Sequence, residues 1–168
     1  ISAAGMTPGI WFMPFAGNHN NPYFDDDIFA KNPDGTPFFD ERWSGACIDS
    51  TSPKGEAFLR QRFKRIYDWG YRYFKIDGLH TGMPSKNTYV NNAYKEEPSF
   101  GSAELYNPDM TFVECFRRGM EILREVGTDT CLQGCTITQN RRSCGPAFGQ
   151  VDAMRVGPDN DSAIRGTW

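Results

Sequence analysis

The chain has 168 residues, a length that suits a single domain, and its formal net charge is −3. It is rich in aromatic residues, with 13 Phe, 7 Tyr and 4 Trp, but it has no run of Lys or Arg, so nucleic acid is not expected as a partner. No apolar stretch approaches the roughly 18 residues that would span a bilayer, which argues against a membrane partner.

The N-terminal part predicts a short helix end, a buried strand and a long loop. Residues 1–5 read as the end of a helix, and the apolar run Gly9 to Phe15 reads as a strand. Residues 16–47 form a polar stretch with many turn residues and several aromatics, which indicates a packed, substrate-facing loop. Its Asp25–Asp27 run fits no EF-hand spacing, so we interpret it as a solvated turn rather than a calcium site.

Two helices and three further strands follow. Ser52 and Pro53 are typical of a helix start, and Gly70 is typical of its end. An apolar strand then runs to Asp77, and a second long loop occupies residues 78–109. A second helix is predicted over 111–126, and the last two strands over 130–136 and 151–156.

This alternation of strands and helices predicts an α/β fold with a parallel sheet. Loops after the strands are long while helix-to-strand turns are short, which favours a (β/α)8 TIM barrel. Four strands make about half a barrel, so residues 1–168 are interpreted as a partial catalytic domain. The start at Ile1, without an initiator Met or signal peptide, agrees with a piece of a longer protein and leaves the compartment open.

Charged residues gather where two of these strands end. In residues 71–77, alternation places Tyr73, Lys75 and Asp77 on one face, with the ammonium and carboxylate at the carboxyl end where barrel sites form. A structural Lys–Asp pair is the alternative reading of that strand alone. In the last strand, Arg155 and Asp159 share a face if the strand stays extended.

Two carboxylates around one substrate are the equipment of glycoside hydrolysis. Asp77 and Asp159 lie on strands that are separated by one other strand, so we expect their carboxylates to approach to about 5–8 Å. The four strands should be neighbours in chain order, ending near Phe15, Asp77, Thr136 and Val156, with helices on one outer face.

The motifs GYRYFKIDG, LQGC and VDAMRVGPDND, with PGIWF near the N-terminus, resemble the melibiase-type α-galactosidases of glycoside hydrolase families 27 and 36. The likeness covers the whole chain, as barrel strands three to six. It implies that Asp77 is the nucleophile and Asp159 the general acid/base of a retaining mechanism.

The same resemblance implies that Lys75 and Arg155 bind sugar hydroxyls and steady the nucleophile. A cation beside Asp159 would disfavour the protonated form that an acid needs, so Arg155 is assigned to substrate and nucleophile. Cys135, with Gly134, is implied to line the site near the 2-position of the sugar.

Further candidates come from single residues. Trp11 and Trp43 could stack on a sugar face, although core packing is the alternative for Trp11, and His80 could hydrogen-bond a substrate or serve structurally. No metal site and no cofactor are predicted. The cysteine count is odd, without zinc-type spacing, so thiols are expected at every position: Cys47, Cys115, Cys131, Cys135 and Cys144.

The leading hypothesis is a retaining α-galactosidase-like hydrolase acting on terminal α-galactosides of an oligosaccharide or glycoconjugate. The missing barrel strands are the other expected partner. An α-N-acetylgalactosaminidase, with room for the acetamido group near Cys135, is one alternative. A barrel fragment that binds glycans without catalysis, or serves only structurally, is the other.

Overall fold

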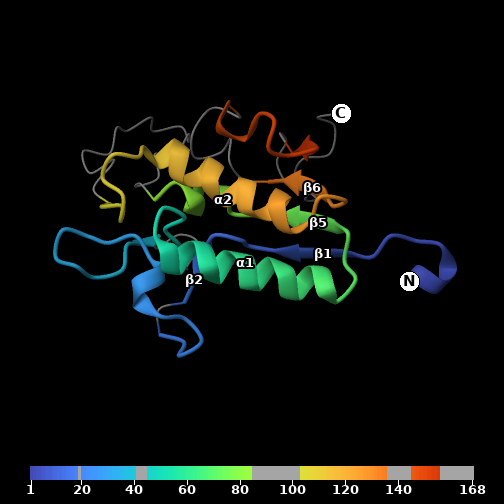
Figure 1. Ribbon diagram of the computed structural model, residues 1–168, viewed down its shortest axis with the longest axis horizontal. Helices are drawn as coiled ribbons and strands as arrows, with labels where there is room; N and C mark the ends of the chain where they lie inside the picture. The colour runs from blue at the N-terminus through green and yellow to red at the C-terminus, as the bar shows by residue number, and fades with distance from the viewer. Residues whose placement is uncertain (19, 41–44, 85–102, 136–144, 156–168) are drawn as a thin grey trace, which may run out of the picture.

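A computed structural model of the chain describes residues 1–18, 20–40, 45–84, 103–135 and 145–155 (Figure 1). Its centre is a parallel sheet in the order β1 (Gly9–Phe12), β5 (Tyr73–Ile76), β6 (Cys131–Gly134) and β7 (Ala153–Met154). The predicted neighbours and their parallel direction are therefore confirmed. This is the arrangement of part of a (β/α)8 barrel.

Two helices cover one face of this sheet, as predicted. Figure 1 shows α1 (Pro53–Asp68) and α2 (Phe112–Val126) lying side by side on the same side of the strands. In the first turn of α1, the Ser52 hydroxyl accepts a hydrogen bond from the Gly55 amide at 2.8 Å. Thr111 and Glu114 form a reciprocal capping box at the start of α2.

The core lies between the sheet and these helices. Apolar strand residues alternate into it, and each helix contributes one apolar face. Its buried members include Phe12, Phe74, Ile76 and Leu132 from the strands, Leu59, Phe63 and Ile66 from α1, and Phe116, Met120 and Leu123 from α2. Among the described residues, no α-helix lies on the opposite face of the sheet (Figure 1).

The first strand is shorter than predicted. It ends at Phe12 rather than near Phe15, because Pro14 has no amide hydrogen to continue a ladder and the chain turns there. Beyond this turn, Ala16 and Gly17 join a second, antiparallel sheet that the sequence did not predict. Its order is β2 (Ala16–Gly17), β4 (Gly45–Cys47) and β3 (Phe39–Asp40). The predicted ends at Thr136 and Val156 lie just outside the described residues.

The described residues of the 16–47 segment are packed, as expected, because Ile28, Phe29 and Phe38 are all buried. Short 3-10 helices occur there and elsewhere, namely η1 (Ser2–Ala4), η2 (Asp26–Ile28), η3 (Leu79–Gly82) and η4 (Gly145–Ala147). No helix among the described residues has the length and apolar character needed to cross a bilayer.

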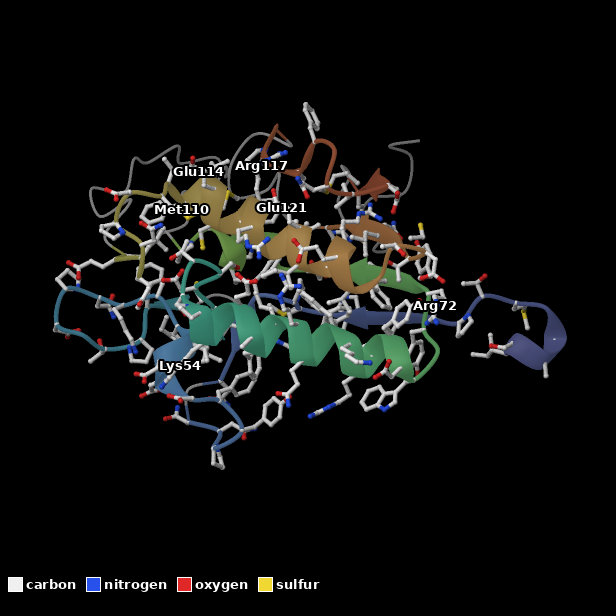
Figure 2. The ribbon with its side chains drawn as sticks, viewed as in Figure 1. Lys54, Arg72, Met110, Glu114, Arg117 and Glu121 are labelled. Atoms are coloured by element: carbon white, nitrogen blue, oxygen red, sulfur yellow. The ribbon has the colours of Figure 1, made fainter. Side chains whose placement is uncertain are left out.

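The aspartates at 25–27 take part in local structure. Asp25 caps η2, and the Lys54 ammonium at the start of α1 lies 3.4 Å from its carboxylate and 2.5 Å from that of Asp27 (Figure 2). A hydrogen bond from the Asp27 amide, together with Lys54, lowers the pKa of Asp25. The run is thus a helix cap paired with a cation.

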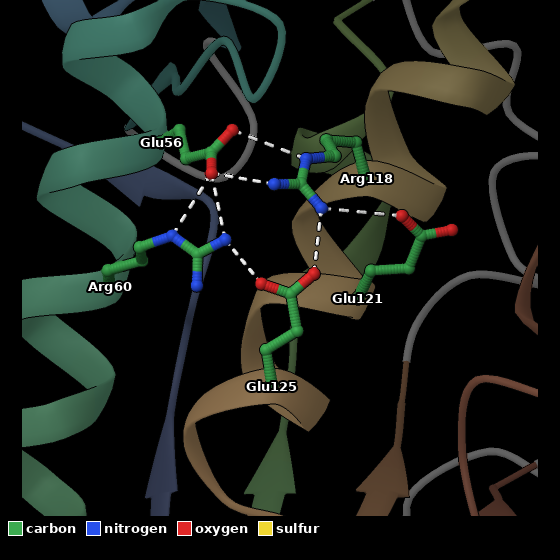
Figure 3. Close-up of polar contacts among 5 residues, drawn as sticks. All are labelled: Glu56, Arg60, Arg118, Glu121 and Glu125. Carbon is green, nitrogen blue, oxygen red and sulfur yellow. Dashed lines mark hydrogen bonds and ion pairs between the residues drawn. The ribbon is translucent and has the colours of Figure 1, made fainter.

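A network of ion pairs joins the outer surfaces of α1 and α2 (Figure 3). Arg118 of α2 contacts Glu56 of α1 at 2.6 Å and Glu125 at 2.9 Å, and Arg60 contacts Glu56 at 2.8 Å. Arg60 also pairs with Glu125, which closes the ring between the helices. Burial alone would raise the pKa of Glu56, but its bonds to Arg118 and Arg60 outweigh burial and lower it.

Replacing Arg118 with Met should destabilise the protein at neutral pH by about 1 kcal/mol or more, because it opens the ring between the helices. The pKa values of Glu56 and Glu125 are lowered in the folded state. The two glutamates therefore contribute fully to folding stability above the ordinary glutamate pKa near 4.5. This contribution is lost as the pH falls through their lowered pKa values in the folded state. The difference in unfolding free energy between Arg118→Met and the parent protein should therefore shrink at acidic pH.

Urea unfolding of the intact protein at pH 7 and pH 3 measures this gap. Lys64→Met is the matched control, since it removes an exposed pair within α1 alone and should cost less than about 0.5 kcal/mol. An Arg118→Met effect that is equally small, or independent of pH, would contradict a stabilising role for the network.

Candidate active site

The helix-free face of the sheet carries the polar residues predicted for the site. Register places Trp11, Lys75, Gln133 and Ala153 in one row across the four strands. Partners in a parallel ladder share a face, so these residues point away from the helices. Their exposure agrees, because Trp11 is 54% exposed whereas its neighbour Phe12 is buried.

Asp77 follows β5 directly and belongs to the next row on the same face. Its amide donates to the Phe12 carbonyl at 3.0 Å, which fixes the backbone at the carboxyl end of the sheet. The alternation that predicted Tyr73, Lys75 and Asp77 on one face is confirmed, since the intervening Phe74 and Ile76 are both buried.

Both oxygens of the Asp77 carboxylate accept hydrogen bonds. The Trp11 indole Nε1–H donates to Oδ2 at 3.1 Å, and the Gly78 amide donates to Oδ1 at 2.8 Å. Gly78 has φ 59°, a left-handed conformation that favours glycine, and a Cβ there would lie 2.6 Å from Met13 Cε. The turn after β5 therefore holds the carboxylate in place from its own backbone.

Arg155 and Cys135 fall in the same row as Asp77 by alternation from their strands. The Arg155 amide donates to the Gly134 carbonyl at 2.9 Å, so the parallel pairing continues past β7. Arg155 is half-buried and Cys135 is buried. Register thus brings Lys75, Asp77, Cys135 and Arg155 to one area of the sheet.

Gly134 lies on the other face. It pairs with Ile76 and Met154, and a Cβ there would meet Met154 Cε at 2.7 Å. Close packing toward the helix layer therefore accounts for glycine at this position. Any contact of Gly134 with a sugar would involve its backbone, and its predicted role remains a prediction.

His80 is buried in η3, with 1% of its surface exposed, which favours the structural reading of this residue over a substrate contact. Trp43 and Asp159 lie outside the described residues. The expected approach of Asp77 to Asp159 therefore stays a prediction. Within the described ranges, no group of three His, Cys, Asp or Glu residues is arranged to hold a metal ion.

Cys115 is a buried thiol away from the site. It is fully buried near the start of α2 and donates to the Asp49 carboxylate at 3.7 Å. Burial, with the Asp49 charge, raises the pKa of Cys115 to about 12, so it stays a protonated, unreactive thiol at neutral pH.

Two features of the site were missed at the sequence level. The sequence predicts a stacking or core role for Trp11, but its indole hydrogen-bonds the predicted nucleophile. The sequence predicts the face of Tyr73 but no role for it, and its hydroxyl hydrogen-bonds Gln133 of the next strand. Position on the open face was the available signal, since both side chains alternate with core residues.

A separate cavity of about 520 Å³ lies between η2, the start of α1 and residues 104–106. Its walls include Phe29, Lys31, Asp49, Lys54 and Tyr106, and none of the open-face residues of the sheet. It is therefore distinct from the area around Asp77.

No family model matches the sequence. Solved structures do match the fold. An α-galactosidase from Thermus thermophilus in complex with stachyose superposes with a TM-score of 0.64 at 22% identity, over 95% of this chain and 30% of that one. An α-galactosidase from Lactobacillus brevis gives a TM-score of 0.60 at 16% identity, over 96% and 20% of the two chains.

An isomalto-dextranase from Arthrobacter globiformis, complexed with panose, gives a TM-score of 0.58 at 14% identity, over 93% of this chain and 26% of that one. At these identities the matches show the fold alone. The chain spans 30% or less of the length of these three proteins. The structure is thus part of an α/β barrel of the type found in these glycoside hydrolases.

Proposed function

We propose that residues 1–168 are part of the catalytic barrel of a retaining α-galactosidase-like glycoside hydrolase. The observation that carries the proposal is Asp77, a carboxylate at the carboxyl end of a central parallel strand, on the open face beside Lys75 and hydrogen-bonded at both oxygens. Two of the neighbours with this fold are α-galactosidases, one of them bound to stachyose, which supports an oligosaccharide substrate.

In this proposal Asp77 attacks the anomeric carbon of a terminal α-galactoside while Asp159 protonates the departing oxygen. The bond to the leaving group breaks as a glycosyl–aspartate ester forms. Asp159 then removes a proton from water, which attacks the same carbon and releases Asp77 as a carboxylate. The configuration at the anomeric carbon is retained because it inverts twice.

The residues around Asp77 supply positive charge and orient the sugar. Lys75 and Arg155 supply positive charge on the face that carries Asp77, which favours its ionised form and binds sugar hydroxyls. Cys135 lies in the same row and would border the 2-position of the sugar. The remaining strands of the barrel would close the site from the other side.

Hydrolysis of nitrophenyl glycosides by the intact protein tests the proposal. We expect turnover of the α-galactoside, with the α-anomer as the first product seen by proton NMR. Preferred turnover of the α-N-acetylgalactosaminide would assign the alternative sugar, and preferred turnover of an α-glucoside would remove galactose from the proposal. A β-anomer as first product would contradict retention, and no turnover of any glycoside would leave a non-catalytic barrel.

A further inference from the structure

The hydrogen bond between Trp11 and Asp77 joins two strands at the centre of the candidate site. Trp11 pairs in register with Lys75, so Asp77, two residues further along the chain and directly after β5, is its diagonal neighbour. Diagonal neighbours on one face are within reach of a long aromatic side chain. The indole uses that reach, with Nε1 at 3.1 Å from Asp77 Oδ2.

Core packing does not account for this tryptophan. Its exposed fraction of 54% is far above that of Phe12 on the other face, at 8%. Indole N–H is a donor only, so its polar atom is committed to an acceptor, and here the acceptor is a carboxylate. Phe at this position would retain ring area on the face but lose the donor.

The two donors to Asp77 differ in kind. The Gly78 amide belongs to the adjacent backbone and holds Oδ1 whatever surrounds it. Trp11 comes from another strand and fixes Oδ2, so together they define the plane of the carboxylate relative to the sheet. A carboxylate has about four lone-pair sites, so each oxygen can still reach a reacting carbon.

We propose that Trp11 is a positioning residue, which holds the Asp77 carboxylate in the orientation for attack through its indole N–H. The inference rests on the proposed function and deepens it. The hydrogen bond acts mainly on the ionised carboxylate, which is present before attack and forms again as the ester breaks. It contributes little while the ester exists.

Among the described residues, the other charged groups that register brings to this face are Lys75 on β5 and Arg155 after β7. Both carry positive charge and act on Asp77 in the same direction as the indole N–H. Removing Trp11 therefore weakens, but does not abolish, the preference for the ionised carboxylate.

Replacing Trp11 with benzothienylalanine in the intact protein tests this directly, because sulfur takes the place of the N–H and the bicyclic shape is kept. We expect kcat to fall about 10–100-fold, because the carboxylate is no longer held in the orientation for attack. The acid limb of the kcat/KM profile should move to higher pH by about half a unit to one unit. Trp11→Phe should show the same two changes.

Trp69→Phe is the control, because Trp69 is 65% exposed at the end of α1 and should leave kcat and the pH profile unchanged. Parent-like kcat in the benzothienylalanine protein, or a lower kcat with an unmoved acid limb, overturns the positioning role. A rise in KM alone assigns Trp11 to sugar stacking and also overturns it. Turnover by Asp77→Asn would instead overturn the proposed function itself, so the two failures are distinct.

Discussion

Asp77→Asn should lower kcat on an α-galactoside by at least about 10³-fold in the intact protein, with little loss of stability. The amide is nearly isosteric with the carboxylate, so the turn at Gly78 and the strand pairing through Phe12 remain possible. An amide is neutral and a poor nucleophile, so no glycosyl ester can form at a useful rate.

Azide separates the nucleophile from the acid/base. With Asp77→Ala, azide can occupy the space of the missing carboxylate and attack the sugar directly, giving a galactosyl azide of inverted configuration. With Asp159→Ala, azide would attack the glycosyl ester instead and give a product of retained configuration. Product configuration by NMR therefore assigns each role.

Asp68→Asn is the control for both variants, since Asp68 pairs only with Lys64 among the contacts described for it, at the exposed end of α1. It should keep parent-like activity. Full activity in Asp77→Asn, with the control behaving as expected, would refute Asp77 as nucleophile and with it the proposed mechanism.

Gly55→Ala should destabilise the protein by about 3 kcal/mol, although alanine is the better helix former by about 1 kcal/mol. Gly55 is buried in the first turn of α1, where an added Cβ would lie 2.0 Å from the Asp49 carbonyl oxygen and 2.9 Å from Ser52 Oγ. Backbone cannot yield as a flexible side chain can, so the start of the helix would have to move.

Ala57→Gly is the matched control for Gly55→Ala, two residues along the same helix at an exposed position. It should cost about 1 kcal/mol through helix propensity alone. Urea unfolding of both variants gives the comparison. A neutral or stabilising Gly55→Ala would mean that propensity prevails and that α1 does not pack this closely on Asp49.

Much of the architecture follows from local sequence signals. Ser52 with Pro53 is a capping pattern whose hydrogen bond forms within the helix start itself, and apolar residues at helical spacing mark the helix over 111–126, so the two helices could be located. Strand order followed from the alternation of strands and helices, because crossovers of that length place successive strands side by side.

Other features depend on contacts between distant residues. β2 and β3 have two residues each, too few to show a period, so the sequence predicts a loop where the antiparallel sheet forms. The bond from Trp11 to Asp77 needs the register of β1 on β5, which no local pattern specifies. The burial of His80 likewise results from tertiary packing, which its position after a strand does not reveal.

Among the described strands, β1 lies at an edge of the parallel sheet, which has a practical consequence. An edge strand offers unpaired backbone groups to any other extended chain, and here an exposed tryptophan lies beside them. Produced as an isolated segment, residues 1–168 would be exposed to strand addition between copies and to aggregation. If the isolated segment is insoluble, the cause would be pairing at the edge of β1, and the result would not bear on the chemistry of Asp77.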